Sequence, residues 1–292
     1  MKDFNNRVAV ITGAGSGFGR EFARIAASRG MHLALADIQR DALDAIAREL
    51  KAAGTRVFAQ RLDVSDATAM ESFADTVFAE YGTAHLLFNN AGVGTGGLIW
   101  EHSVADWQWV LGVNLWGVIH GIRCFVPRMI AGNDEGHIIN TASVAGLLSA
   151  QTMGPYNVSK HGVVTLSETL FQDLRISGSK LGVTVLCPAF VDTGIKDAGR
   201  NRPADLSNAA PPTESQRLAE EQTRKAVTSG RISAAGIAAK TFTAIEENRF
   251  YCLTHPRILG SVELRLQDIL TQRNPSDPFT AKPEVAFAAR SP

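Results

Sequence analysis

The sequence has few of the residues that mark metal-bound or disulfide-linked proteins. Its only cysteines are Cys124, Cys187 and Cys252, which lie far apart and form no C-x-x-C pair. We therefore expect neither a disulfide framework nor a zinc site, but buried reduced thiols in a cytoplasmic protein. The seven histidines form no H-x-x-x-H pair, so nothing in the sequence requires a metal.

Net charge and long apolar runs are also absent. Lysine plus arginine number 29, and aspartate plus glutamate also number 29, so we expect no nucleic-acid or anionic-membrane partner. The start, MKDFNNRVAVITG, lacks the apolar segment and cleavage site of a secretory signal. No apolar run approaches the roughly 20 residues that cross a bilayer.

Short apolar runs instead alternate with longer amphipathic stretches. Six runs are expected to be strands, at 7–11, 32–36, 56–60, 85–89, 136–140 and 183–187. The stretches between them that end in glycine, as helices often do, are 19–30, 41–54 and 69–82. The alternation predicts an α/β fold with a parallel sheet, helices on both faces, and a ligand site beyond the carboxyl ends of the strands.

The regular pattern ends after Thr193. Residues 194–232 are polar and contain prolines, and this connection is long enough to be a lid over the site. A helix at 233–248, a short strand at 250–254 and a helix at 259–272 are expected to follow. The sequence thus predicts a single domain over 1–275 and a loosely ordered, proline-rich tail at 276–292.

A glycine-rich turn follows the first expected strand. In TGAGSGFG, residues 12–19, glycines alternate with other residues directly before a helical stretch. Helix N-termini present unpaired N–H groups, and glycine lets a pyrophosphate approach the backbone. Phe18 stands where the G-x-G-x-x-G fingerprint has its third glycine. The pattern fits either a different nucleotide loop or a turn that is rich in glycine for packing alone.

Asp37 ends the second expected strand, at the distance from the glycine turn where a ribose-binding acid is expected. Its carboxylate can accept both ribose hydroxyls and would repel a 2′-phosphate. Neither Ser16 nor Ile38, its expected neighbours, supplies a basic group for that phosphate. The sequence therefore favours NAD(H) over NADP(H), the alternative being a solvated aspartate at a strand end.

Tyr156 and Lys160 lie four residues apart in a segment that Pro155 can start as a helix, so they share one face. A nearby ammonium, together with an oxidised nicotinamide, would lower the pKa of the tyrosine toward general-base work. Ser143 follows the fifth expected strand and could hydrogen-bond a substrate oxygen. Taken alone, a tyrosine and a lysine at this spacing are ordinary neighbours on a helix surface.

Five motifs occur together, in order: TGAGSGFG (12–19), NNAG (89–92), Asn114 in GVNLWG, Ser143, and YNVSK (156–160). With this spacing the chain resembles the short-chain dehydrogenase/reductase family over about residues 5–255. The resemblance implies a Rossmann-type, doubly wound sheet and reversible hydride transfer between a nicotinamide and an alcohol or carbonyl. The family loop is T-G-x-x-x-G-x-G, so Gly15 is expected to be expendable.

The resemblance also implies roles by motif position. Tyr156 would be the acid/base, Ser143 would orient the substrate oxygen, and Lys160 would hold the nicotinamide ribose and tune Tyr156. Asn114 would anchor a water that links Lys160 to solvent. Besides Tyr156 and Lys160, the expected cofactor contacts are Gly13, Ser16, Gly17, Phe18, Gly19, Asp37, Asp63, Val64, Asn90, Ala91, Gly92, Pro188, Val191 and Thr193.

One position departs from the family pattern, because Ala189 follows Pro188 where glycine is usual. We expect the change to be tolerated. The leading hypothesis is an NAD-dependent dehydrogenase of a secondary alcohol. Its rivals are an NADPH-dependent carbonyl reductase, which Asp37 opposes, and a silent nucleotide-sensing regulator, which the complete set of catalytic residues opposes.

The substrate is less well determined. The expected pocket residues favour an uncharged, hydrophobic or aromatic small molecule, unless they simply pack the core; they are Trp100, Leu147, Leu148, Met153 and Phe190. The long lid and the C-terminal strand and helix also resemble family members that oxidise bulky aryl alcohols. Arg200 and Arg202, in the lid, could instead recruit an anionic group.

The segments at about 103–131 and 155–177 carry broad apolar faces. Family members usually pair these two helices into a four-helix bundle between subunits. We therefore expect a homodimer or homotetramer, with burial inside a monomer as the alternative.

Overall fold

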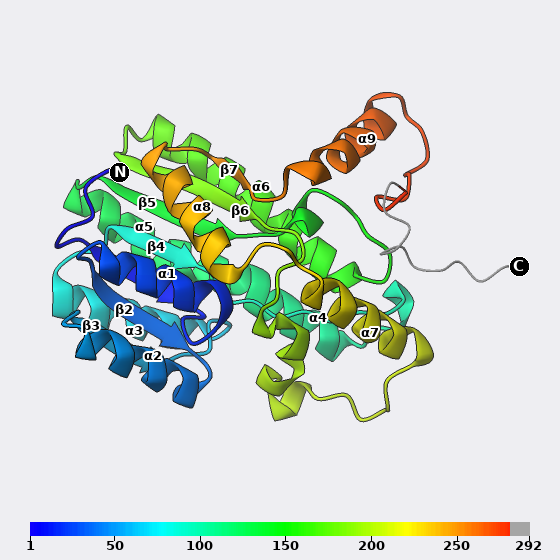
Figure 1. The fold of residues 1–292 in the computed structure, drawn as a ribbon, viewed down its shortest axis with the longest axis horizontal. Coiled ribbons are helices and arrows are strands. Elements are labelled where there is room, and N and C mark those ends of the chain that lie inside the picture. Colours follow the sequence, from blue (N-terminus) through cyan, green and yellow to red (C-terminus); the bar gives the residue numbers. More distant parts are fainter. Residues whose placement is uncertain (281–292) are drawn as a thin grey trace, which may run out of the picture.

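The computed structural model describes residues 1–280 and contains a seven-stranded, all-parallel sheet (Figure 1). The strand order is β3-β2-β1-β4-β5-β6-β7. The expected doubly wound fold is confirmed, because the order reverses between β1 and β4. The strands are β1 (Val8–Thr12), β2 (His32–Asp37), β3 (Val57–Arg61), β4 (Leu86–Asn89), β5 (Gly136–Thr141), β6 (Leu181–Cys187) and β7 (Tyr251–Leu253).

Helices cover both faces of this sheet. One core joins the sheet to α1 (Gly17–Ser28), α2 (Arg40–Ala52) and α8 (Ala234–Glu246). The opposite core joins it to α3 (Ala67–Tyr81), α5 (Gly117–Gly132) and α6 (Gly154–Ile176). Alternation along the strands produces this division, since Ala9 and Ile11 of β1 enter the first core and Val10 enters the second.

A single helical rod of 29 residues, Val104–Gly132, contains α4 (Val104–Leu111), a π-helical segment (Gly112–Trp116) and α5. By length and composition alone this rod is long and apolar enough to cross a membrane. The sequence analysis, which looked for an uninterrupted apolar run, did not identify it. More than half of its most apolar window is buried inside the protein.

The three cysteines are also buried, and none is disulfide-bonded, as expected.

The long connection after β6 contains more regular structure than its composition suggests. Two 3-10 segments, Gly194–Asn201 and Ala204–Leu206, precede the helix α7 (Glu214–Thr228), which the sequence analysis missed. A capping box starts α7, in which Thr213 accepts from the backbone of Gln216 and the Gln216 side chain accepts from the backbone of Thr213. We call residues 194–232 the lid.

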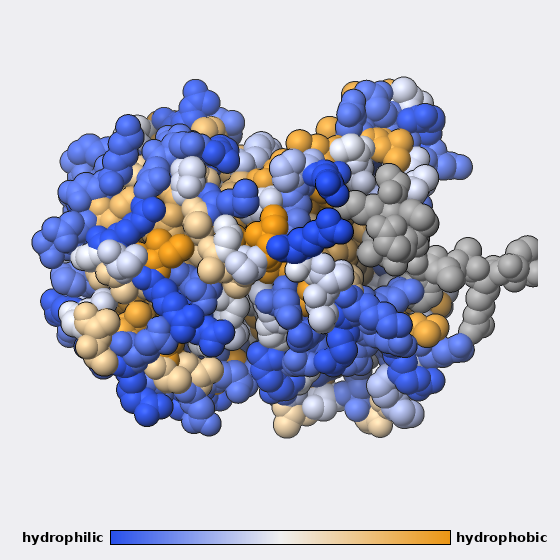
Figure 2. Space-filling model, in the orientation of Figure 1, coloured by the Kyte–Doolittle hydropathy of each residue, from blue (hydrophilic) through white to orange (hydrophobic). Residues whose placement is uncertain are grey.

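The last helix, α9 (Leu259–Leu270), projects at the upper right of Figure 1. It carries exposed Leu266, Ile269 and Leu270, and Figure 2 shows hydrophobic residues there against a mostly hydrophilic face. Of the tail expected at 276–292, residues 281–292 lie outside the described part of the chain.

Close packing of α5 on β4 depends on Gly121. A Cβ built at Gly121 would lie 2.0 Å from Oδ1 of Asn89, whose Nδ2 donates to Asn140 on β5 at 2.9 Å. We predict that Gly121→Ala lowers the free energy of unfolding by about 3 kcal/mol, because it overpacks the interface and disturbs a buried hydrogen bond. Chemical denaturation measures this change.

Gly132→Ala on the same helix is the matched control. The nearest atom to its new Cβ is Oγ1 of Thr83 at 4.0 Å, so its effect should stay within about 1 kcal/mol. Equal effects of the two substitutions would contradict the packing argument.

Candidate active site

A cavity of about 1180 Å³ opens at the carboxyl edge of the sheet, between the sheet domain and the lid. This volume exceeds the roughly 300–1,000 Å³ of most small-molecule sites, so it has room for two ligands. Sixteen of the expected site residues line it: Gly13, Ser16, Gly17, Phe18, Asp37, Asp63, Val64, Asn90, Ala91, Gly92, Ser143, Tyr156, Lys160, Pro188, Val191 and Thr193. The other two, Gly19 and Asn114, lie behind its wall.

The glycine turn has the shape of a phosphate cradle. Gly13 and Gly17 have φ of +65° and +52°, which side chains rarely adopt. A Cβ at Gly19 would lie 2.1 Å from the carbonyl oxygen of Gly13, so Gly19 acts by letting α1 begin against the turn. Ser16 is the N-cap of α1 without a side-chain capping bond. The turn therefore fits a pyrophosphate at the N-terminus of α1.

Asp37 faces this turn from the end of β2. Its Oδ2 accepts from the N–H of Gly15, and its Oδ1 from the N–H of Gln39, both at 2.8 Å. Burial raises the pKa of this carboxyl, and the two backbone hydrogen bonds oppose that rise. A Cβ at Gly15 would lie 3.0 Å from Oδ2 of Asp37 and from Cβ of Ala42, so an alanine there requires these side chains to shift slightly. That Gly15 is expendable stays a prediction.

Two arginines lie near this acid, although the sequence analysis weighed only Ser16 and Ile38 as its neighbours. Nε of Arg61 donates to the carbonyl of Ile38 at 3.1 Å. Arg200, from the lid, acts electrostatically to lower the pKa of Asp37. Arg200 is far away in sequence, so only the folded lid reveals this electrostatic interaction.

A hydrogen-bonded floor joins the ends of β1, β4 and β5. Nδ2 of Asn90 donates to the carbonyl of Thr12 at 3.0 Å, and Oγ1 of Thr12 accepts from the N–H of Asn90 at 2.9 Å. Oγ1 of Thr141 donates to Oδ1 of Asn90 at 3.3 Å. Sequence reasoning named Asn90 and included Thr12 in the glycine-rich motif, but it gave neither threonine a role.

Lys160 is buried beneath this floor with 2% of its surface exposed. Its Nζ donates to the carbonyl of Thr141 at 2.9 Å and lies 5.7 Å from the ring centroid of Tyr156. Burial lowers the pKa of Lys160 from 10.5 to about 8. The lysine therefore remains charged at neutral pH close to the tyrosine. One of its three N–H groups donates to Thr141, and the others can donate to a ligand.

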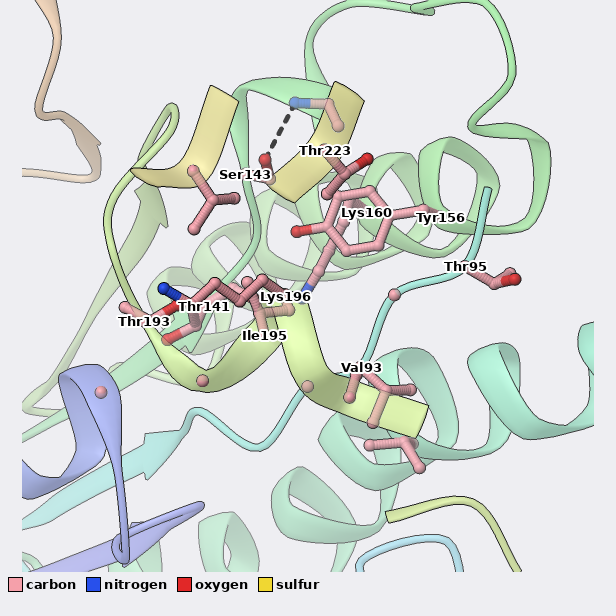
Figure 3. A pocket seen from close by; sticks show the side chains of 18 of the residues that line it. Val93, Thr95, Thr141, Ser143, Tyr156, Lys160, Thr193, Ile195, Lys196 and Thr223 are labelled. Atoms are coloured by element: carbon pink, nitrogen blue, oxygen red, sulfur yellow. Dashed lines mark hydrogen bonds between the residues drawn. The ribbon is translucent and has the colours of Figure 1, made fainter. Parts of the chain in front are cut away.

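Tyr156 and Ser143 point into the cavity together (Figure 3). Burial raises the pKa of Tyr156, and a hydrogen bond with Ser143 opposes that rise. The lowering expected from Lys160 together with an oxidised nicotinamide stays a prediction. Oγ of Ser143 donates to the carbonyl of Pro188 at 3.3 Å and accepts from the N–H of Ala145 at 3.2 Å.

Asn114 occupies the π-helical segment and is fully buried. Its Oδ1 accepts from the N–H of Val93 at 2.8 Å, and its Nδ2 donates to the carbonyl of Val93 and to Oγ of Ser159. One side-chain donor thus positions the loop after β4, and the other joins the π-helical segment to α6. A π-bulge at a functional site is a common arrangement.

The outer wall of the cavity differs in part from the expectation. Leu148, Met153 and Phe190 line it, whereas Leu147 packs in a core cluster and Trp100 is 76% exposed outside it. From α7, which the sequence analysis missed, the lid adds polar residues that line the same cavity, namely Gln216, Glu220 and Thr223.

The backbone at Ala189 takes no positive φ, in line with the expected tolerance of alanine there. Its N–H donates to Nδ1 of His255 at 3.2 Å. The loop after β6 is therefore joined to the turn after β7.

Comparison with known proteins gives the same family as the motifs. A family model described as short chain dehydrogenase matches residues 7–203. A crystal structure of a short chain dehydrogenase/reductase from Burkholderia phymatum in complex with NAD is 55% identical, with a TM-score of 0.94. The match covers 95% of this chain and 99% of that one.

Two relatives by sequence match over nearly their whole length. The CLA biosynthesis dehydrogenase/reductase of Lactiplantibacillus plantarum is 34% identical, over 94% of this chain and 97% of its own. The C alpha-dehydrogenase of Sphingobium sp. is 33% identical, over 98% and 93%. With its parallel sheet and its family motifs gathered at one cavity, the chain belongs to the short-chain dehydrogenase/reductase family of oxidoreductases.

Proposed function

We propose that this protein is an NAD-dependent dehydrogenase that interconverts a secondary alcohol and a ketone. The observation that carries the proposal is the placement of Ser143, Tyr156 and Lys160 in the same cavity as the glycine turn and Asp37. A dinucleotide that extends from the turn along the strand ends would bring its nicotinamide to these three side chains.

Each residue has a defined part in this chemistry. When bound, the nicotinamide supplies the hydride acceptor or donor. Ser143 hydrogen-bonds the substrate oxygen and holds it toward Tyr156. The Tyr156 hydroxyl gives its proton to a ketone oxygen during reduction and recovers one from the alcohol during oxidation. Lys160 stabilises the phenolate by its charge, and its free N–H groups suit the nicotinamide ribose hydroxyls.

Asp37 supports a preference for NAD(H), because a carboxylate suits a ribose diol and repels a 2′-phosphate. The NAD-bound Burkholderia relative is in keeping with this preference. Arg200 favours the alternative, an NADPH-dependent carbonyl reductase, since its charge acts on Asp37 and offsets that repulsion. We place NAD(H) first because Asp37 directly faces the glycine turn.

An uncharged, fairly hydrophobic or aromatic alcohol is the proposed substrate. Leu148, Met153 and Phe190 support this class from the cavity wall. The relative named C alpha-dehydrogenase is in keeping with it. We also propose a dimer or tetramer built on α4, α5 and α6, because Val158 on α6 and Trp116, between α4 and α5, are about half exposed.

Removal of the transferable proton tests the acid/base assignment. We predict that Tyr156→Phe lowers kcat about 10²–10⁴-fold for a secondary aryl alcohol such as 1-phenylethanol. NADH affinity, measured by fluorescence titration, should change less than threefold, because the ring remains in place. Tyr251→Phe, at an exposed tyrosine outside the cavity, is the matched control. A Tyr156→Phe enzyme with more than a tenth of wild-type turnover would place proton transfer elsewhere.

Cofactor choice is tested at Asp37. We predict that Asp37→Ala weakens NAD binding at least fivefold and strengthens NADP binding, because the repulsive carboxylate is lost while Arg200 remains. Calorimetric titration with each nucleotide measures both affinities. Asp41→Ala, an exposed acid on α2, is the control. Wild-type protein that binds NADP as tightly as NAD would overturn the preference.

A further inference from the structure

The first part of the lid is tied to the helical rod by an ion pair whose carboxylate is buried. NH1 of Arg202 donates to Oδ1 of Asp106 at 2.7 Å, and the Asp106 side chain is only 2% exposed. The same carboxylate accepts from Nδ2 of Asn208 at 3.0 Å and from the N–H of Ser103 at 2.9 Å. Asp106 thus joins lid residues to the start of α4.

Packing around this pair holds Arg202 in one position. Its Nε donates to the carbonyl of Leu206 at 2.7 Å, and its guanidinium lies 5.2 Å from the ring centroid of Trp109. Leu206 and Ala198 pack in the same apolar cluster as Trp109. By contrast, the ion pair of Arg224 and Asp197, which lies within the lid, is about half exposed. It therefore contributes little to the stability of the lid.

The segment held by this pair crosses the part of the cavity expected to hold the cofactor. The segment comprises residues 194–208. Just before it, Thr193 faces Gly17, since a Cβ placed at Gly17 would lie 3.2 Å from Cβ of Thr193. In the middle of the segment, Oδ1 of Asn201 accepts from Nε2 of Gln39 at 2.6 Å, and Gln39 follows β2 by two residues. The segment therefore spans from the glycine turn to the ribose-binding edge, and its residues line the cavity.

We propose that Asp106 and Arg202 are positioning residues that latch lid residues 194–208 over the bound dinucleotide. The inference rests on the proposed function only in requiring that the nucleotide binds along the strand ends. A nucleotide held under this segment leaves only after the pair separates. Its apparent affinity therefore rises with the fraction of molecules in which the pair is formed.

An ion pair suits a latch that must open once in every catalytic cycle. Burying two charges costs desolvation that their attraction only partly offsets, so such a pair adds little net stability compared with apolar packing. Both charges regain water when the lid opens. The pair thus fixes the closed geometry without making product release prohibitively slow.

The test measures nucleotide release, not only activity. We predict that Arg202→Gln raises the NADH dissociation rate, followed by stopped-flow fluorescence, about tenfold and weakens NADH affinity to a similar extent. The KM for 1-phenylethanol at saturating NAD should stay within twofold, and Arg202→Lys should recover part of the loss. Arg217→Gln removes the same charge from α7 outside the cavity and is the matched control.

Asp106→Asn breaks the pair from the other side while keeping an oxygen that can accept from the N–H of Ser103. If the two residues act as a pair, the double variant releases NADH no faster than either single variant. Release at the wild-type rate by Arg202→Gln, or a rise in alcohol KM alone, would overturn the latch. Wild-type protein that binds no NADH would instead overturn the proposed function, and the latch with it.

Discussion

The buried ammonium of Lys160 is the constraint on which the site depends. An isolated charge in a protein interior is costly, and here burial lowers its pKa to about 8. The carbonyl of Thr141 accepts from it, and Thr141 in turn is bonded to Asn90 beside the glycine turn. The lysine therefore fixes the end of β5 to the floor of the cavity, and one helical turn away it sets the charge near Tyr156.

Much of this arrangement could be predicted from sequence, because local patterns determine it. Apolar runs gave all seven strands, including the short β7, and the glycine spacing located the phosphate turn. Ser143, Tyr156 and Lys160 meet because the carboxyl ends of parallel strands and the start of α6 share one edge of the sheet. Motif order was sufficient for that inference.

The features that sequence did not reveal depend on contacts between distant segments. Helix α7 is polar on most of its surface, and only its contact with the cavity shows why it is ordered. Arg202 and Asp106 are 96 positions apart and match no motif. The raised pKa of Tyr156 likewise reflects burial by surrounding elements, which spacing along one helix does not reveal.

The central claim is that Lys160 is retained for chemistry at the expense of stability, and Lys160→Met tests it most directly. Converted to energy, the shift from 10.5 to about 8 corresponds to about 3 kcal/mol. This penalty is complete below pH 8 and disappears as pH rises to 10.5, because the native lysine loses its proton first. Chemical denaturation at pH 7 should show a variant at least as stable as wild type, with the gap narrowing toward pH 10, and no turnover of 1-phenylethanol. A variant that unfolds more easily yet keeps its activity would contradict the account.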